Sequence, residues 1–97
     1  MITIWKYKLE VSHEPQELNL PRYSEIISCG NMEMEEYVWV KFDDLFANET
    51  EIRKVILIPT GYKIDNAVKL RRFIGTSIMP TNDEPFPYIV HHIYECY

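Results

Sequence analysis

Apolar and polar residues alternate along most of the chain with the two-residue period of β-strands. The first alternating run, residues 2–11, gathers on one face Thr3, Trp5, Tyr7, Leu9 and Val11. Further runs of strand character cover residues 16–21, 24–33, 36–42, 52–59, 71–79 and 88–97, and Pro21 and Pro80 mark the ends of two of them. Strands at intervals of about ten residues, with turn signals between them, predict one β-rich domain over residues 1–97. We expect an all-β antiparallel sandwich or barrel of about six to seven strands.

Local signals refine this outline. Residues 52–59 are nearly continuously apolar, which predicts a strand covered on both faces. Gly30-Asn31 predicts a bulge or turn, and residues 43–51 form the one segment with some helical character. Residues 65–72 fit a helical turn capped by Asp65 or Asn66, or a short strand; a loop with one helical turn is favoured.

The chain is rich in aromatic residues, at 13% of the sequence. Most of them occupy alternating strand positions, which is typical of core residues, and base stacking in the manner of an OB-fold is the alternative. Tyr62, between Gly61 and Lys63, and Tyr97 are expected to be exposed.

Charge is distributed unevenly around a net value of -5. Residues 52–79 hold six basic residues and one acid, whereas acids gather in residues 33–36 and 43–51. Solvated loop ends and strand edges explain this pattern, and a dipolar surface with one anion-attracting face is the alternative. An acidic chain argues against duplex DNA as a partner, because such binding needs many phosphate contacts.

Catalytic and metal-binding motifs are missing from the sequence, so we expect a non-enzyme without metal or cofactor. His91-His92 is the one histidine pair, and adjacent strand residues point to opposite faces, so one inward and one outward histidine are expected. Cys29 and Cys96 fit two unpaired thiols in a reducing compartment. No run of about 18 apolar residues predicts a membrane helix, and the lysine-containing start does not fit a signal peptide.

The basic loop 59–76 holds the candidate binding residues. Thr60-Gly61 follows a strand, so free backbone amides near Lys63 fit a small anion-binding nest. Arg71 and Arg72 add planar bidentate donors. The competing interpretation is that Gly61 supplies a positive φ for a turn and that the cations are solvated. The candidate ligand or partner site is Thr60, Gly61, Tyr62, Lys63, Arg71 and Arg72.

Six short segments occur in order along nearly the whole chain: "IWKYKLEV", "NLPRYSEIIS", "YVWVKFD", "IPTGYKID", "IGT" and "IVHHIYE". Together they resemble a family of small, functionally uncharacterised proteins encoded mostly by tailed bacteriophages. The chain departs from the family pattern at Lys8, where proline is expected, and at Tyr62, where histidine is expected.

The resemblance implies a phage-type accessory protein in the cytoplasm of a bacterial host, and it brings no catalytic residues. By analogy with small phage proteins, we expect stoichiometric binding that inhibits a host defence protein or sequesters an anionic, nucleotide-type signal. Two alternatives stay open: single-stranded nucleic-acid binding through the aromatic and basic residues, and a structural, oligomer-forming role. Exposed β edges offer a route to self-association.

Overall fold

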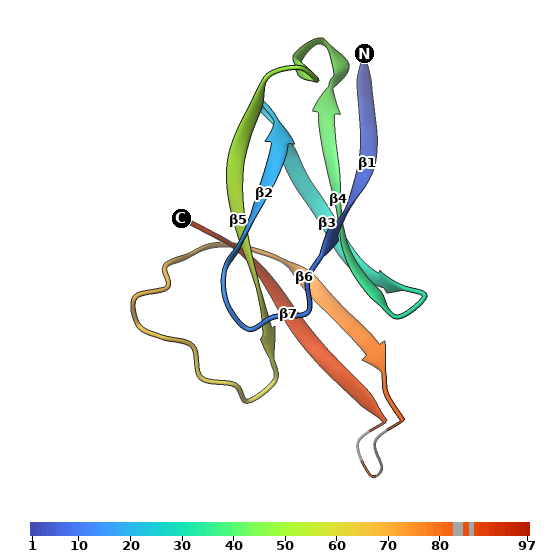
Figure 1. Cartoon of the computed structure of the whole chain (residues 1–97), viewed down its shortest axis with the longest axis vertical. Coiled ribbons are helices and arrows are strands. Elements are labelled where there is room, and N and C mark those ends of the chain that lie inside the picture. The colour runs from blue at the N-terminus through green and yellow to red at the C-terminus, as the bar shows by residue number, and fades with distance from the viewer. Residues whose placement is uncertain (83–84, 86) are drawn as a thin grey trace.

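A computed structural model of the chain describes residues 1–82, 85 and 87–97. Seven strands and one 3-10 helical turn occur in these residues (Figure 1). The elements are β1 (Ile2–Leu9), β2 (Gln16–Pro21), β3 (Glu25–Met32), β4 (Glu35–Asp43), η1 (Asp44–Phe46), β5 (Thr50–Pro59), β6 (Leu70–Pro80) and β7 (Tyr88–Cys96). In the described part of the chain, no helix is long and apolar enough to cross a membrane.

The strands form two antiparallel sheets, which confirms the predicted all-β sandwich. Sheet A has the order β1-β4-β3, and sheet B has the order β2-β5-β7-β6. Pro21 and Pro80 end their strands as expected, because proline cannot donate to a ladder. The predicted helical character of residues 43–51 corresponds to η1, where the Asp43 carboxylate accepts a hydrogen bond from the Leu45 amide at 3.0 Å.

The core between the sheets is aliphatic. The buried cluster comprises Leu9, Leu18, Leu20, Ile26, Val38, Val40, Val55, Leu57 and Ile93. The expectation that most aromatic residues are core was wrong: among the described residues no Phe, Tyr or Trp is buried, and Tyr7 and Phe42 only pack against the cluster's margin. Branched aliphatic side chains fill the space between the sheets, and the aromatic rings lie at the margin of this core or outside it. Tyr62 and Tyr97 are exposed, as predicted.

The connection between β3 and β4 differs from the prediction. Gly30 and Asn31 lie inside β3, where they pair with Tyr37 and Glu36, and the bulge falls instead between Ile26 and Ser28. The chain reverses at residues 33 and 34, which have φ angles of 52° and 68°. Two successive positive φ angles make a tight hairpin turn that usually selects Asn or Gly, so Glu33-Met34 gave no turn signal in the sequence.

Strand β5 is covered on both faces, as its apolar run predicted. Val55, Ile56 and Leu57 are all fully buried. Val55 and Leu57 face the core, whereas Ile56 points to the outer side of sheet B. Two loops, residues 10–15 and residues 60–69, cover that outer side at Ile56.

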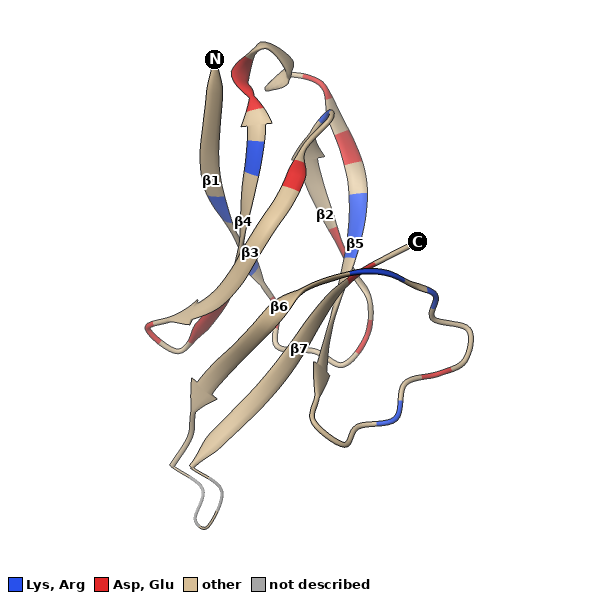
Figure 2. Cartoon of the chain, turned by 180° about the vertical axis from the view of Figure 1, so that it is seen from behind, with Lys and Arg blue, Asp and Glu red and all other residues tan. Residues whose placement is uncertain are grey.

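The two edges of sheet A are in different environments. At one edge, β3 meets the edge strand β6 of sheet B and closes the sandwich. A Cβ atom at Gly75 would lie 2.9 Å from the Cys29 sulfur, so only glycine fits at this approach of β6 to β3. The opposite edge is β1, which lies at the side of the molecule with β4 as its one strand neighbour among the described residues (Figures 1 and 2).

Candidate functional site

The predicted Thr60–Lys63 segment forms a tight turn at the end of β5. The Tyr62 amide donates to the Pro59 carbonyl at 3.0 Å, and Gly61 adopts a φ of 83°. A positive φ at the third position is the requirement of a type II turn, so Gly61 has the turn-forming role that was one of the two interpretations. The Thr60 hydroxyl and the His92 ring nitrogen lie 2.8 Å apart, which fixes the turn to the outer face of β7.

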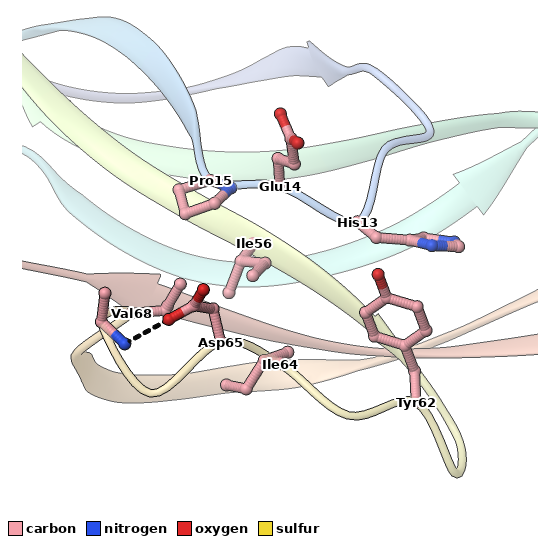
Figure 3. A pocket seen from close by; sticks show the side chains of 9 residues that line it. His13, Glu14, Pro15, Ile56, Tyr62, Ile64, Asp65 and Val68 are labelled. Carbon is pink, nitrogen blue, oxygen red and sulfur yellow. Dashed lines mark hydrogen bonds between the residues drawn. The ribbon is translucent and has the colours of Figure 1, made fainter.

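Beyond this turn, the chain encloses a pocket of about 420 Å³ on the outer side of sheet B. Ile56 lies buried beneath it, and Pro15 of the first loop faces Ile64 and Val68 of the second across it (Figure 3). The loop 60–69 holds its shape because Asp65 accepts from the Ala67 amide at 2.7 Å and the Val68 amide donates to the Asp65 carbonyl at 3.0 Å. The loop with one helical turn that was favoured for residues 65–72 is therefore a single hydrogen-bonded turn at residues 65–68, because residues from Leu70 onward belong to β6.

Two rings form the rim of the pocket. The His13 and Tyr62 rings have centroids 4.5 Å apart and planes inclined by 56°, so the two loops touch at this point (Figure 3). Tyr62 keeps 46% of its surface exposed. Glu14 and Asp65 also line the pocket, and Lys63 adjoins it in sequence. The rim therefore combines aromatic surface with a small excess of acid.

Arg71 and Arg72 belong to a different structure. Both approach the buried Glu95 carboxylate, at 3.2 Å and 3.8 Å, and Arg53 binds the same group at 2.5 Å. Burial alone would raise the Glu95 pKa, but the Arg53 hydrogen bond and the charges of the three arginines outweigh it and lower the pKa. Glu95 is thereby held ionised inside the protein.

The same arginines connect the two sheets. Arg72 donates to the Ile26 carbonyl at 2.5 Å, and Arg53 donates to the Ser24 carbonyl at 2.8 Å, so both reach the start of β3. Glu95 stands on β7 of the other sheet. Glu95 has three arginine partners, and two of them, Arg53 and Arg72, also bind backbone carbonyls at the start of β3. We call Glu95 and these three arginines the clasp, and it satisfies charges that would otherwise be costly to bury.

The six predicted site residues therefore separate into two groups. Thr60 is hydrogen-bonded to Val90 and sits near one end of β7, whereas Arg71 and Arg72 sit at Glu95 near the other end. Five residues of extended chain between Val90 and Glu95 correspond to about 16 Å. Figure 2 shows the positive residues spread along this loop and the start of β6 rather than gathered at one point.

A second buried polar group lies between the sheets. His91 faces inward and His92 outward, as predicted, and His91 Nδ1 lies 3.6 Å from the Glu36 carboxylate. Burial lowers the His91 pKa, and the Glu36 charge only partly opposes this. Ser77 is paired with His91 across the β6–β7 ladder, and its hydroxyl has no hydrogen-bond partner among the described residues.

Serine, histidine and glutamate are the residue types of hydrolase triads, but a triad must reach the substrate and these three residues are buried. Ser77 is 2% exposed, His91 1% and Glu36 0%, so none of the three can touch a substrate in this conformation. The Cys29 thiol is also unfit as a nucleophile, because burial and the Glu36 charge raise its pKa to about 11. Among the described residues, no group of three or more His, Cys, Asp or Glu side chains is placed to hold a metal ion.

Two participants were not found from the sequence. His13 lies 49 positions before Tyr62, and nothing in its own segment indicates that the two loops meet. Glu95 shares the inward strand face of His91 and Ile93, and this spacing is a usable signal in the sequence, because an acid on an apolar face needs a cationic partner.

The chain belongs to the family described as Domain of unknown function (DUF7352), whose model matches residues 1–97. No curated protein and no solved structure matches it.

Proposed function

We propose that this protein is a non-catalytic accessory factor that binds a bacterial host protein stoichiometrically and inhibits it by occlusion. The resemblance to tailed-phage proteins supports the setting, which is the cytoplasm of an infected host. The target-binding surface in this proposal is the pocket between residues 10–15 and 60–69, together with its Tyr62 rim.

The observation that carries the proposal is the composition of the pocket. A half-exposed tyrosine beside apolar Pro15, Ile64 and Val68, and a volume of about 420 Å³, leave ample room for a large side chain of a protein partner. Residues that anchor protein interfaces are typically aromatic side chains or arginines that enter such pockets. Glu14 and Asp65 on the rim favour an anchor that carries a positive charge beside its apolar part.

A nucleotide-type ligand is the second candidate, and one observation favours it. Tyr62 and His13 present ring surface at the mouth of the pocket, with Lys63 next in the chain. A base could stack there while Lys63 meets a phosphate. The arginines that would strengthen phosphate binding are engaged by Glu95, and for this reason the protein partner is preferred.

The test is affinity capture from bacterial lysate, followed by calorimetry with the purified captured protein. We expect a partner that binds in a ratio of one to one and without chemical change to either chain. Tyr62→Ala should weaken binding by at least about tenfold, the value of losing 1.4 kcal/mol.

Tyr23→Ala provides the matched control, because Tyr23 is also exposed but stands in the β2–β3 turn. This variant should bind as the unmodified protein does. Capture that is indifferent to Tyr62→Ala would contradict the proposed surface. A rise in melting temperature with nucleotides alone, lost in Tyr62→Ala, would favour the second candidate instead.

A further inference from the structure

The edge strand β1 is exposed to an unusual extent. Ile2, Ile4 and Trp5 have 60%, 50% and 63% of their surface exposed, on both faces of the strand. Edge strands are usually short, bulged or interrupted by proline, because an open edge invites another strand. β1 is neither short nor bulged and contains no proline, since all eight of its residues pair with β4 without a register shift, so its protection is limited to the charges of Lys6 and Lys8.

The direction of the free backbone groups follows from two hydrogen bonds. In an antiparallel ladder, the N–H and C=O of one residue point to the same side, and successive residues alternate. The Met1 carbonyl accepts from the Asp44 amide, on the β4 side. Glu10 points the other way, because its amide and carbonyl are both bound by the Gln16 side chain, at 2.8 and 2.9 Å.

Odd-numbered residues of β1 therefore bond to β4, and even-numbered residues point away from it. The outward set is Ile2, Ile4, Lys6 and Lys8. At Glu10 the Gln16 side chain already makes the two backbone hydrogen bonds that a neighbouring strand would make, so the edge with free backbone groups ends there. The part left for pairing runs from Ile2 to Lys8, and its centre is Trp5.

We propose that β1 pairs with β1 of a second copy of this chain, antiparallel and centred on Trp5. Ile4 of each copy then lies opposite Lys6 of the other, and Ile2 lies opposite Lys8. Every outward backbone group of the open segment finds a partner, and the two three-stranded sheets join into one continuous sheet. The two Trp5 rings face each other across the junction, an arrangement that contributes favourably in antiparallel sheets.

Charge and the number of paired residues favour this register. Sliding one copy by two residues toward Glu10 puts Lys6 directly opposite Lys6, and like charges in that position are destabilising. Sliding it the other way moves Lys8 past the end of the opposing β1. In the centred register each lysine meets an isoleucine, which its aliphatic stem can cover, while Lys8 keeps its Glu35 partner at 3.2 Å.

The first test is sedimentation equilibrium of the purified chain over a wide range of concentration. We expect a reversible dimer. Ile4→Lys should weaken it by at least about tenfold, because it creates two lysine–lysine contacts. Ile4→Lys combined with Lys6→Glu should restore it, since each new lysine then faces a glutamate. Ile52→Lys is the matched control: Ile52 is 60% exposed, close to the 50% of Ile4, but lies on β5, and this change should leave the dimer intact.

The register is tested by cross-linking in a Cys29→Ala/Cys96→Ala background. Directly opposed residues of a non-hydrogen-bonded pair have Cα atoms about 4.5 Å apart, within the range that a disulfide spans. Trp5→Cys should therefore form a covalent dimer under mild oxidation. Thr3→Cys should not react with itself, but should cross-link to Tyr7→Cys in a mixture. A chain that is monomeric at every concentration, or a dimer indifferent to Ile4→Lys, would overturn the proposal.

Discussion

The two edges of sheet A show contrasting uses of the same kind of strand. At the β3 edge, polar side chains bind groups within the protein: Arg72 donates to the Ile26 carbonyl, and Glu95 pairs with the arginines. Gly75 lets β6 approach Cys29 at the same edge. At the β1 edge, apolar side chains and backbone groups face solvent. The β3 edge therefore contributes to stability, whereas the β1 edge is the one that we propose for association, so substitutions at the two edges should change different measurements.

The largest expected effect is at the clasp of the closed edge. Glu95→Ala leaves Arg53, which is 17% exposed, without its carboxylate, and removing one partner of a buried pair costs about 3–5 kcal/mol. Chemical denaturation should show this loss of unfolding free energy. Glu51→Ala removes a second, more exposed Arg53 partner and should cost less than about 1 kcal/mol. Equal costs for the two variants would contradict the clasp.

A smaller loss is expected where β6 touches β3. Gly75→Ala forces a methyl group to within 2.9 Å of the Cys29 sulfur, and overpacking of this kind costs about 1–3 kcal/mol. Cys29→Ala in the same chain should recover most of that loss. At Gly30 an added methyl group meets Trp39 at an ordinary 3.5 Å, so Gly30→Ala is the control and should be close to neutral. Thermal unfolding distinguishes these variants.

The buried His91 should make the stability of the fold decrease in acid. Burial lowers the His91 pKa below its ordinary value of 6.5, so the unfolded chain binds a proton more readily than the folded one. Stability is then greatest above about pH 6.5 and falls as pH decreases toward the folded-state pKa. His91→Gln should flatten this dependence in denaturation curves, whereas His92→Gln should keep it. An unchanged slope in His91→Gln would contradict the assignment.

The smallest effect on stability is expected at the open edge. Trp5 is 63% exposed, so Trp5→Ser should change the unfolding free energy by no more than about 0.5 kcal/mol, measured at a concentration where the chain is monomeric. Tyr7→Ser, two residues further along the same face, removes a ring that packs against the core and should cost clearly more. A large loss for Trp5→Ser would mean that this edge also supports the fold.

The sequence predicted the strands well because alternation and proline are local signals. Pro21 and Pro80 marked strand ends, and the continuous run of β5 indicated cover on both faces. The Glu33-Met34 reversal was missed because neither residue is a usual turn former. The aromatic residues were misplaced because alternation identifies a face of a strand but not how far the opposite sheet extends over it.

The candidate site was predicted less completely, because its contacts join residues that are far apart in the sequence. Gly61 and Tyr62 gave local signals, and the structure places them in a turn and on a pocket rim. The contact of Tyr62 with His13, and the engagement of Arg72 by Glu95, join residues far apart in the chain. Such pairings depend on sheet order, which one sequence does not reveal.

Amide hydrogen exchange by NMR, at a low and a high protein concentration, tests the difference between the two edges most directly. At low concentration the Ile4 and Lys6 amides should exchange rapidly while those of Trp5 and Tyr7 are protected by β4. At high concentration Ile4 and Lys6 should gain protection, and β6 should not change. If the Ile4 and Lys6 amides are equally protected, or equally exposed, at both concentrations, β1 is not the associating edge and the account is contradicted.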